Sequence, residues 1–164
     1  MTHTYQEILA LRAIRDYEKK PIDPSHLEAI LEAARWTGSS KNRQDWSFVV
    51  VDDPDRLQGL AEHGDFTQPV RDSAATIVLV KEPGGNMFDI GRAAQNIMLA
   101  ARTQGVASCP ITLHRSDDCR AFLGLGPDQV AMYAVALGYP TPDAEPRRYG
   151  GRKAPSEVIR ADRT

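Results

Sequence analysis

Two arginines near the start of the chain have the side chains and the spacing to hold a phosphate. Arg12 and Arg15 lie three residues apart in the stretch LRAIRDY, so a turn or a helix end presents both guanidinium groups on one side. Each guanidinium offers paired N–H donors to the oxygens of a dianion. The alternative is a solvated basic turn, which is the commoner case for two arginines alone because charged side chains are mostly exposed.

Other polar or reactive side chains indicate less by themselves. Residues 37–46, TGSSKNRQDW, predict a loop because Ser, Asn and Gly are frequent in the stretch. Cys109 and Cys119 have neither the spacing of metal ligands nor a disulfide framework, so we expect two buried thiols. The four histidines are dispersed, and no catalytic triad or acid–base dyad is recognisable. Side chains alone therefore identify no metal centre and no nucleophile.

Length and composition limit the class of protein. At 164 residues the chain is long enough for one domain, residues 1–164, that buries roughly two thirds of its unfolded surface. A net charge of −2 and scattered Lys and Arg give no indication of nucleic-acid binding. The longest apolar run, residues 131–137, is far shorter than the about 20 residues of a membrane span. The N-terminus lacks the pattern of a signal peptide, so we expect a cytoplasmic location, which the cysteine usage fits.

The element that must position these side chains is a central helix within residues 86–109. Its apolar residues recur at helical spacing, and its second half is apolar all round. Such a helix must run through a core or into a partner subunit. Asn86 or Asp89 can cap its start, and Gly105 suits the left-handed residue that ends it. Residues 106–113 then predict a buried strand.

The remaining pattern predicts a sheet with helices around it. Helices are expected over residues 4–12, 24–36, 54–62 and 117–125, and strands over 46–52, 75–81 and 131–137. The first of these strands, WSFVVVD, is too apolar for a sheet with one wet face. Residues 141–150 are rich in Pro, Arg and Gly and should be extended and irregular. Periodicity thus predicts four strands and about six helices.

Several motifs together resemble those of the FMN-dependent nitroreductase family. The central helix reads Asp-x-Gly-x-Ala-x-Gln-Asn-x-x-Leu-Ala-Ala and is followed by Gly-x-x-Ser-Cys. The stretch 11–17 is similar to the family's Arg-Arg-Ser-Ile-Arg-x-Phe, with Leu11 and Ala13 departing from it. The loop at 39–46 is similar to Ser-x-Asn-x-Gln-Pro-Trp, with Asp45 in place of Pro. The strand end ALGYP at 136–140 and the basic stretch GRKAP at 151–155 match in the same order.

This resemblance implies a set of site residues. In the family the first motif holds the FMN phosphate and ribityl chain, and the serine and asparagine loop reaches the flavin of the other subunit. Backbone groups after the central helix contact the flavin ring, and the basic stretch near the C-terminus completes the phosphate site. In the family a polar residue shortly before the second strand contacts the flavin ring. Gln68 lies near that position, and the alternative is that it is an ordinary surface glutamine. The expected cofactor-binding residues are Arg12, Ala13, Ile14, Arg15, Ser39, Ser40, Asn42, Gln68, Ser108, Cys109, Pro110, Ile111, Arg152 and Lys153.

The resemblance also implies a fold and an activity. The expected fold is α+β, with a mostly antiparallel four- to five-stranded sheet flanked by helices in an intertwined homodimer. The expected activity is electron transfer from NADH or NADPH through FMN to a nitroaromatic, a quinone or another small acceptor, by a ping-pong mechanism at flavin N5 without a catalytic side chain. Alternatives are a flavin-storage protein and a relative that binds a deazaflavin. Residues 81–85 replace a longer helical excursion that covers the flavin in larger relatives.

Overall fold

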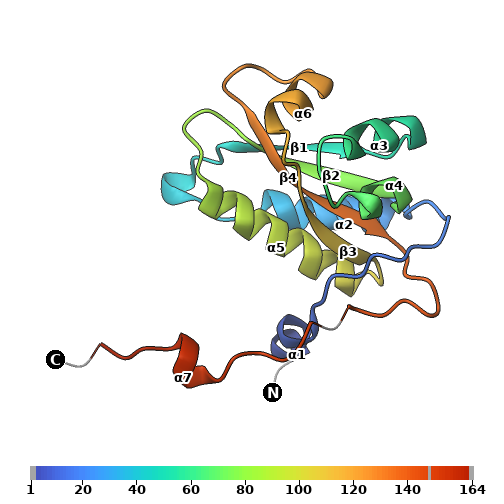
Figure 1. Cartoon of the computed structure of the whole chain (residues 1–164). Coiled ribbons are helices and arrows are strands. Elements are labelled where there is room, and N and C mark those ends of the chain that lie inside the picture. Colours follow the sequence, from blue (N-terminus) through green and yellow to red (C-terminus); the bar gives the residue numbers. More distant parts are fainter. Residues whose placement is uncertain (1–2, 148, 163–164) are drawn as a thin grey trace.

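The computed structural model describes residues 3–147 and 149–162, and its centre is a four-stranded antiparallel sheet (Figure 1). The strand order is β1-β2-β4-β3, so β2 and β4 are central and β1 and β3 are edge strands. Ile77 of β2 lies opposite Val135 of β4. The strands are β1 (Trp46–Val51), β2 (Ala75–Lys81), β3 (Ala107–Thr112) and β4 (Val130–Gly138). The expectation of an α+β fold with a mostly antiparallel sheet is confirmed.

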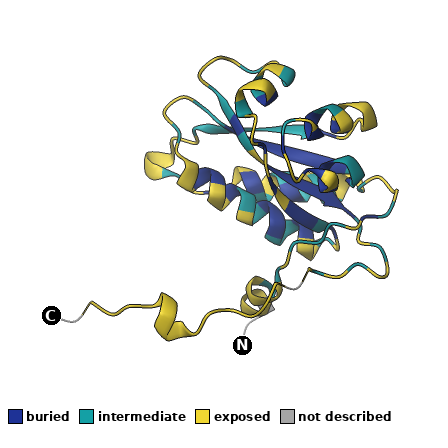
Figure 2. Ribbon diagram, viewed as in Figure 1, coloured by how far each residue is buried: buried dark blue, intermediate teal, exposed yellow. Residues whose placement is uncertain are grey.

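Helices cover both faces of this sheet. The α-helices are α1 (His3–Ala10), α2 (Pro24–Arg35), α3 (Pro54–Ala61), α4 (Gln68–Asp72), α5 (Met87–Thr103), α6 (Ser116–Phe122) and α7 (Pro155–Val158), with a 3₁₀ turn η1 (Ser40–Asn42). On one face α2 and α5 bury a cluster that includes Ile77 and Leu79, while on the other α3, α4 and α6 pack around Val78. The alternation follows from the two-residue period of a strand. Figure 2 shows the buried residues along the central strands and the inner side of α5.

The central helix forms as the sequence predicts. The Asn86 side-chain oxygen accepts a hydrogen bond of 2.9 Å from the Asp89 N–H, which caps the first turn. Gly105 has φ +69° just after the helix ends. Ile97, Met98 and Ala101 are buried in its second half, which confirms that this part runs through a core.

The edge strands differ from the expectation of full burial. Only Val51 of the six residues in β1 is buried, and the other five are intermediate. In β3 the exposed residues Pro110 and Thr112 alternate with buried ones. An edge strand has a neighbour on one side only, so part of each side chain stays uncovered. Pro110 fits an edge position because it cannot donate to a strand beside it.

The ends of the chain lie apart from this core. Helix α1 ends at Ala10, two residues earlier than expected, and the Arg12 guanidinium donates to the carbonyls of Leu9 and Leu11 at 2.8 and 2.7 Å. Residues 149–162 are all exposed, and Figures 1 and 2 show this tail leading away from the sheet past α1. The short helices α4 and α7 were not predicted from the sequence.

The connection from β2 to α5 is short. Residues 82–86 join the two elements and contain no helix, as the sequence predicts. Within the described residues, no helix is long and apolar enough to cross a membrane. Over the same ranges, no group of three or more His, Cys, Asp or Glu side chains is arranged to hold a metal ion.

Candidate functional site

The segment that holds Arg12 and Arg15 is fixed against the end of the sheet. The Ile14 N–H donates to the Ser108 carbonyl at 3.0 Å, which attaches the segment to the open edge of β3. The buried Tyr17 hydroxyl donates to the Ile14 carbonyl at 2.9 Å. Its ring lies against Gly138, where an added Cβ would approach the Tyr17 side chain to 2.8 Å. The glycine at the end of β4 therefore allows the close packing that positions the two arginines.

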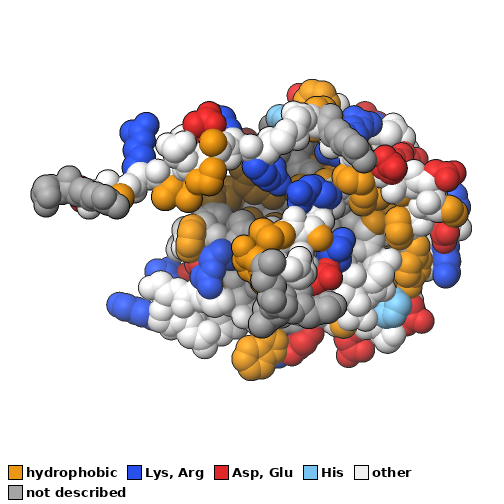
Figure 3. All heavy atoms as spheres, turned by 90° about the horizontal axis from the view of Figure 1, so that it is seen from below, with side chains coloured by type: hydrophobic (Ala, Val, Ile, Leu, Met, Phe, Trp, Pro, Cys, Tyr) orange, Lys and Arg blue, Asp and Glu red, His pale blue; other side chains and the backbone are white. Residues whose placement is uncertain are grey.

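Arg12 and Arg15 line a cavity of about 400 Å³, which we call the basic cavity. Its walls come from two segments far apart in the sequence, around residues 12–15 and 146–152. The lining residues are Arg12, Ala13, Arg15, Pro146, Arg147, Tyr149, Gly150, Gly151 and Arg152. Four of them are arginines and none is acidic, so the cavity attracts anions. Figure 3 shows Lys and Arg side chains gathered near the middle of this face, beside a hollow.

Two glycines leave room at the wall of the basic cavity. Gly150 has φ +99°, a conformation that side-chain-bearing residues rarely adopt, and no atom lies within 4 Å of a Cβ added at Gly150 or Gly151. A ligand can therefore approach the backbone closely here. Arginines with an open glycine backbone fit a phosphate group.

A second cavity of about 390 Å³ adjoins the first, and we call it the mixed cavity. Arg15 and Arg147 line both cavities and so form their shared wall. The mixed cavity adds acidic and neutral polar groups: Asp16, Asp65, Thr67, Gln68 and Asp72. Gln68 is exposed, and its amide donates to Asp72 at 2.8 Å. It thus lies beside the second cavity and not in the basic one.

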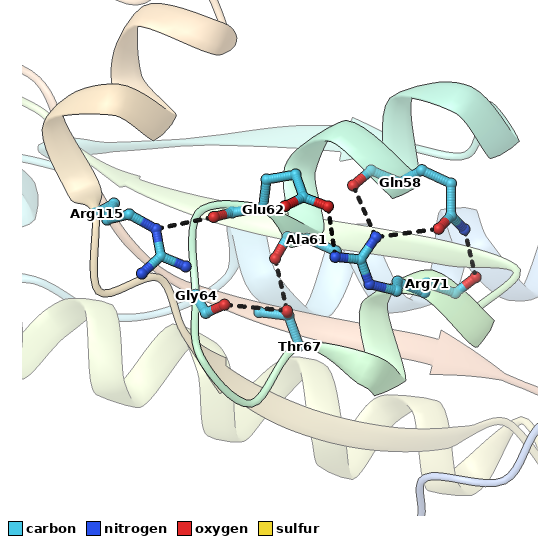
Figure 4. A network of polar contacts seen from close by, with 7 residues as sticks. All are labelled: Gln58, Ala61, Glu62, Gly64, Thr67, Arg71 and Arg115. Carbon is cyan, nitrogen blue, oxygen red and sulfur yellow. Dashed lines mark hydrogen bonds and ion pairs between the residues drawn. The ribbon is translucent and has the colours of Figure 1, made fainter.

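A network of hydrogen bonds fixes the loop that walls the mixed cavity (Figure 4). The buried Thr67 hydroxyl donates to the Ala61 carbonyl at 2.6 Å and approaches the Gly64 carbonyl at 3.3 Å. Arg71 donates to the Glu62 carboxylate at 2.6 Å, and this bond lowers the pKa of Glu62. Arg115 donates to the Glu62 carbonyl at 2.8 Å. These hydrogen bonds hold the loop of residues 62–67 in place beside the mixed cavity.

The expected backbone donors of β3 divide between its two edges. The Ser108 carbonyl accepts from Ile14, so the backbone groups of Ser108 face away from β4. Successive residues of a strand direct their backbone groups to opposite edges, so those of Cys109 and Ile111 face β4. Pro110 has no N–H. Of the four expected residues, only Ser108 therefore presents a backbone donor to the open edge, and Thr112 is the next residue that does so. Thr112 was not among the expected residues, although strand alternation is the signal that identifies it.

Cys109 lies close to the shared arginine wall but remains a neutral thiol. Burial raises its pKa, while the positive charges of Arg15 and Arg147 lower it less. Cys109 and Cys119 are both buried and free, as expected.

The serine and asparagine loop lies away from the basic cavity within one chain. Arg92 near the start of α5 donates to the Gly38 carbonyl at 2.7 Å, so the loop stands at this end of the helix. Arg102 near the other end pairs with Glu7 of α1, next to the arginine segment. Arg92 and Arg102 are ten residues apart in α5, which separates the two contacts by roughly 15 Å along the helix. Ser39, Ser40 and Asn42 are thus not brought together with Arg12 and Arg15 in the single chain.

Two polar side chains of the basic cavity were not anticipated. Arg147 and Tyr149 come from the irregular stretch 141–150, and a hydrogen bond from the guanidinium to the Tyr149 phenol raises the pKa of Arg147. The run of basic residues at 147–148 was the available signal. Of the basic pair near the C-terminus, Arg152 lines the cavity, whereas Lys153 is exposed and lines neither cavity.

The fold and the site together define an α+β protein with an anion-binding cavity beside an edge strand. The nitroreductase family matches residues 8–78 and 58–139, which is most of the chain. The chain belongs to the nitroreductase family.

Individual relatives agree with this assignment. A protein from Archaeoglobus fulgidus with the provisional name NADH dehydrogenase/NAD(P)H nitroreductase is 29% identical over 171 residues, which cover 98% of each chain. An NADPH-flavin oxidoreductase from Vibrio harveyi is 26% identical over 169 residues, covering 90% of this chain and 70% of that protein. A crystal structure from Desulfovibrio desulfuricans, of a provisionally named nitroreductase in complex with FMN, has a TM-score of 0.86 at 24% identity and covers 100% of this chain and 99% of that one.

Proposed function

We propose that this protein is an FMN-dependent oxidoreductase that passes electrons from NADH or NADPH to a small acceptor such as a nitroaromatic or a quinone. The observation that carries the proposal is the basic cavity, in which arginines from two distant segments surround an open glycine backbone. A flavin is supported by family membership and by the Vibrio harveyi relative, which is named as a flavin oxidoreductase. FMN is a flavin with a terminal phosphate, so the cavity fits FMN better than riboflavin.

The residues would divide the binding between the two cavities. Arg12 and Arg152 would hold the phosphate in the basic cavity, with Gly150 and Gly151 against its oxygens. Gln68 and the open edge of β3 would offer hydrogen bonds to the polar side of the flavin ring in the mixed cavity. Arg15 stands at the wall between them. Its positive charge would stabilise negative charge that arrives with electrons.

A bound flavin would supply the redox chemistry, by which electrons from the nicotinamide reach the acceptor in ping-pong order. The residues of the chain would bind the flavin and orient it. The protonated, buried thiol of Cys109 takes no part, because burial raises its pKa.

We propose that the working unit is an intertwined homodimer. On helix α1 the side chains of Tyr5, Ile8 and Leu9 are 47–51% exposed. In the tail, Val158 and Ile159 are 62 and 69% exposed. Helix α7 has only four residues, too few to be stable in water without a partner surface. The Ser39–Asn42 turn holds positive φ at Lys41 and Asn42, a strained backbone of the kind found at binding sites. A second copy would bring this turn to the flavin.

We further propose that the whole chain, residues 1–164, forms a single flavin-binding domain in the cytoplasm. Buried free thiols and a nicotinamide substrate both fit a reducing compartment.

The proposal is tested by titrating the purified protein with FMN and measuring its mass in solution. We expect one FMN per chain and a dimer, with riboflavin bound more weakly. A monomer that leaves FMN fluorescence unchanged would reject the proposal. A dimer that binds FMN but does not transfer electrons from either nicotinamide would instead be a storage protein. Preference for a deazaflavin over FMN would identify the other alternative.

A further inference from the structure

Arg115, in the connection between β3 and α6, holds the loop of residues 62–67, part of which lines the mixed cavity. Its Nε donates to the Glu62 carbonyl at 2.8 Å (Figure 4), and its backbone N–H donates to the His63 carbonyl at 2.9 Å. Its Nη1 donates to the Asp65 carboxylate at 2.7 Å. One residue therefore attaches three residues of the loop to the end of β3.

The loop also packs closely against the backbone of this connection, which requires a glycine at residue 64. A Cβ added at Gly64 would lie 2.7 Å from the Thr112 carbonyl oxygen and 2.5 Å from Cγ2 of Thr67. His114 adds a further contact, because its Nδ1 accepts from the Asp65 N–H at 3.2 Å. The connection therefore sets the position of this wall of the mixed cavity.

Arg115 also balances a negative charge on the cavity wall. Asp65 lines the mixed cavity, whereas Arg115 lines neither cavity. The hydrogen bond from Arg115 lowers the pKa of Asp65, so this carboxyl group is ionised at neutral pH. Nδ1 of His114 lies 3.8 Å from the carboxylate, but it accepts the Asp65 N–H and so carries no proton in this arrangement. The guanidinium of Arg115 is therefore the charged partner of Asp65.

We propose that Arg115 is a positioning residue of the flavin site, which holds the loop of residues 62–67 beside the flavin ring and balances the charge of Asp65 there. The inference rests on the proposed binding of FMN and adds to it an ion pair that tunes the reduction potential. Reduction brings negative charge to the ring, so an unpaired Asp65 disfavours it and an unpaired Arg115 favours it. The two side chains are 43 and 55% exposed, so water screens the effect and the shifts are modest.

The test measures two properties of the full-length protein: its affinity for FMN and riboflavin, and the reduction potential of bound FMN by anaerobic equilibration with a reference dye. Arg115→Ala should weaken both flavins by a similar factor, about three- to tenfold, because the loop faces the ring and not the phosphate. The potential should fall by about 15–30 mV, which is a three- to tenfold change in relative affinity at about 30 mV per tenfold for two electrons. Asp65→Asn should raise the potential by a similar amount, since it leaves Arg115 without its carboxylate.

Three further variants separate charge from geometry. Arg115→Lys keeps the charge but not the fork of donors, so it should retain the potential and recover only part of the affinity. The double variant Arg115→Ala, Asp65→Asn removes both charges and should return the potential to nearly the wild-type value. Arg120 of α6 also pairs with a carboxylate, that of Asp117 at 3.9 Å, and lines neither cavity. Arg120→Ala is therefore the matched control and should change neither property.

The outcomes separate this inference from the proposed function. Opposite shifts of the potential in Arg115→Ala and Asp65→Asn support the inference, because a loosened loop alone does not follow the sign of the lost charge. The inference alone is overturned if the wild-type protein binds FMN but the two variants do not shift the potential in opposite directions, or if Arg115→Ala leaves both flavin affinities unchanged. Wild-type protein that binds no FMN would overturn both. If Arg115→Ala does not fold by circular dichroism, Arg115→Gln replaces it and is judged in the same way.

Discussion

Arg15 differs from Arg12 because it stands between two cavities and is only partly exposed. We expect Arg15→Ala to weaken FMN by roughly 1.5–3 kcal/mol, or about ten- to a hundredfold, because a charged hydrogen bond is lost. Fluorescence titration with FMN and with riboflavin measures this. An FMN affinity that does not change would place Arg15 outside the cofactor site.

The spacing of Arg12 and Arg15 allowed both side chains to face one side, and both line the basic cavity, although a solvated basic turn was the commoner alternative for two arginines alone. The position of Arg147 could not be predicted in this way. Its stretch has no hydrophobic period, so only the folded structure shows that this side chain lines the basic cavity. The stretch around Gln68 has no periodic pattern either, so the sequence did not show which cavity Gln68 lines.

The buried thiol of Cys119 should make the stability of the protein depend on pH in the alkaline range. Burial raises the pKa of its thiol to about 11, so the folded chain holds this proton more tightly than the unfolded chain. The thiol therefore contributes stability below its unfolded pKa, and that contribution is lost as pH rises toward about 11. Burial shifts the Tyr17 pKa in the same direction.

We expect the free energy of unfolding of the wild-type protein to fall between about pH 9 and 11. In Cys119→Ala this free energy should fall less steeply with pH. Urea unfolding at several pH values gives both slopes, and values at neutral pH correct for the lost side-chain volume. Parallel slopes for the two proteins would mean that Cys119 titrates normally.

At the scale of elements, the loop of residues 62–67 depends on one hydroxyl group. Thr67→Val keeps the shape of the side chain but leaves the Ala61 carbonyl without its 2.6 Å hydrogen bond. We expect a loss of about 1–3 kcal/mol in unfolding free energy. Hydrogen exchange of residues 62–67 should also become faster. Thr67→Ser retains the hydroxyl and is the control, and similar losses in both variants would assign the effect to packing.

The elements predicted best are those whose burial is uniform. The bounds of β2, residues 75–81, were predicted without error because the strand is central and its first six residues are buried. The edge strands β1 and β3 carry similar apolar residues, but their order in the sheet is a property of the whole fold. Helix α4 has five residues and no periodic pattern, so the sequence could not indicate it.

At the scale of the whole molecule, the short β2–α5 connection provides no lid for a bound flavin. Five residues, 82–86, extend at most about 18 Å and cannot fold back over a flavin ring. Closure of a site normally excludes water and sharpens the choice of substrate. We therefore expect small and bulky quinones to be reduced at similar, modest rates, with peroxide formed in air. Strong preference for one acceptor with little peroxide would mean that another segment, such as residues 141–150, closes the site.

The most direct test of the central claim is rapid anaerobic mixing of the FMN-loaded dimer with NADH and, separately, with NADPH. The account predicts that the visible flavin absorbance disappears with at least one nicotinamide and returns when a quinone is added. Absorbance that stays unchanged with both nicotinamides, in protein that has bound FMN at one per chain, would contradict the proposed oxidoreductase function.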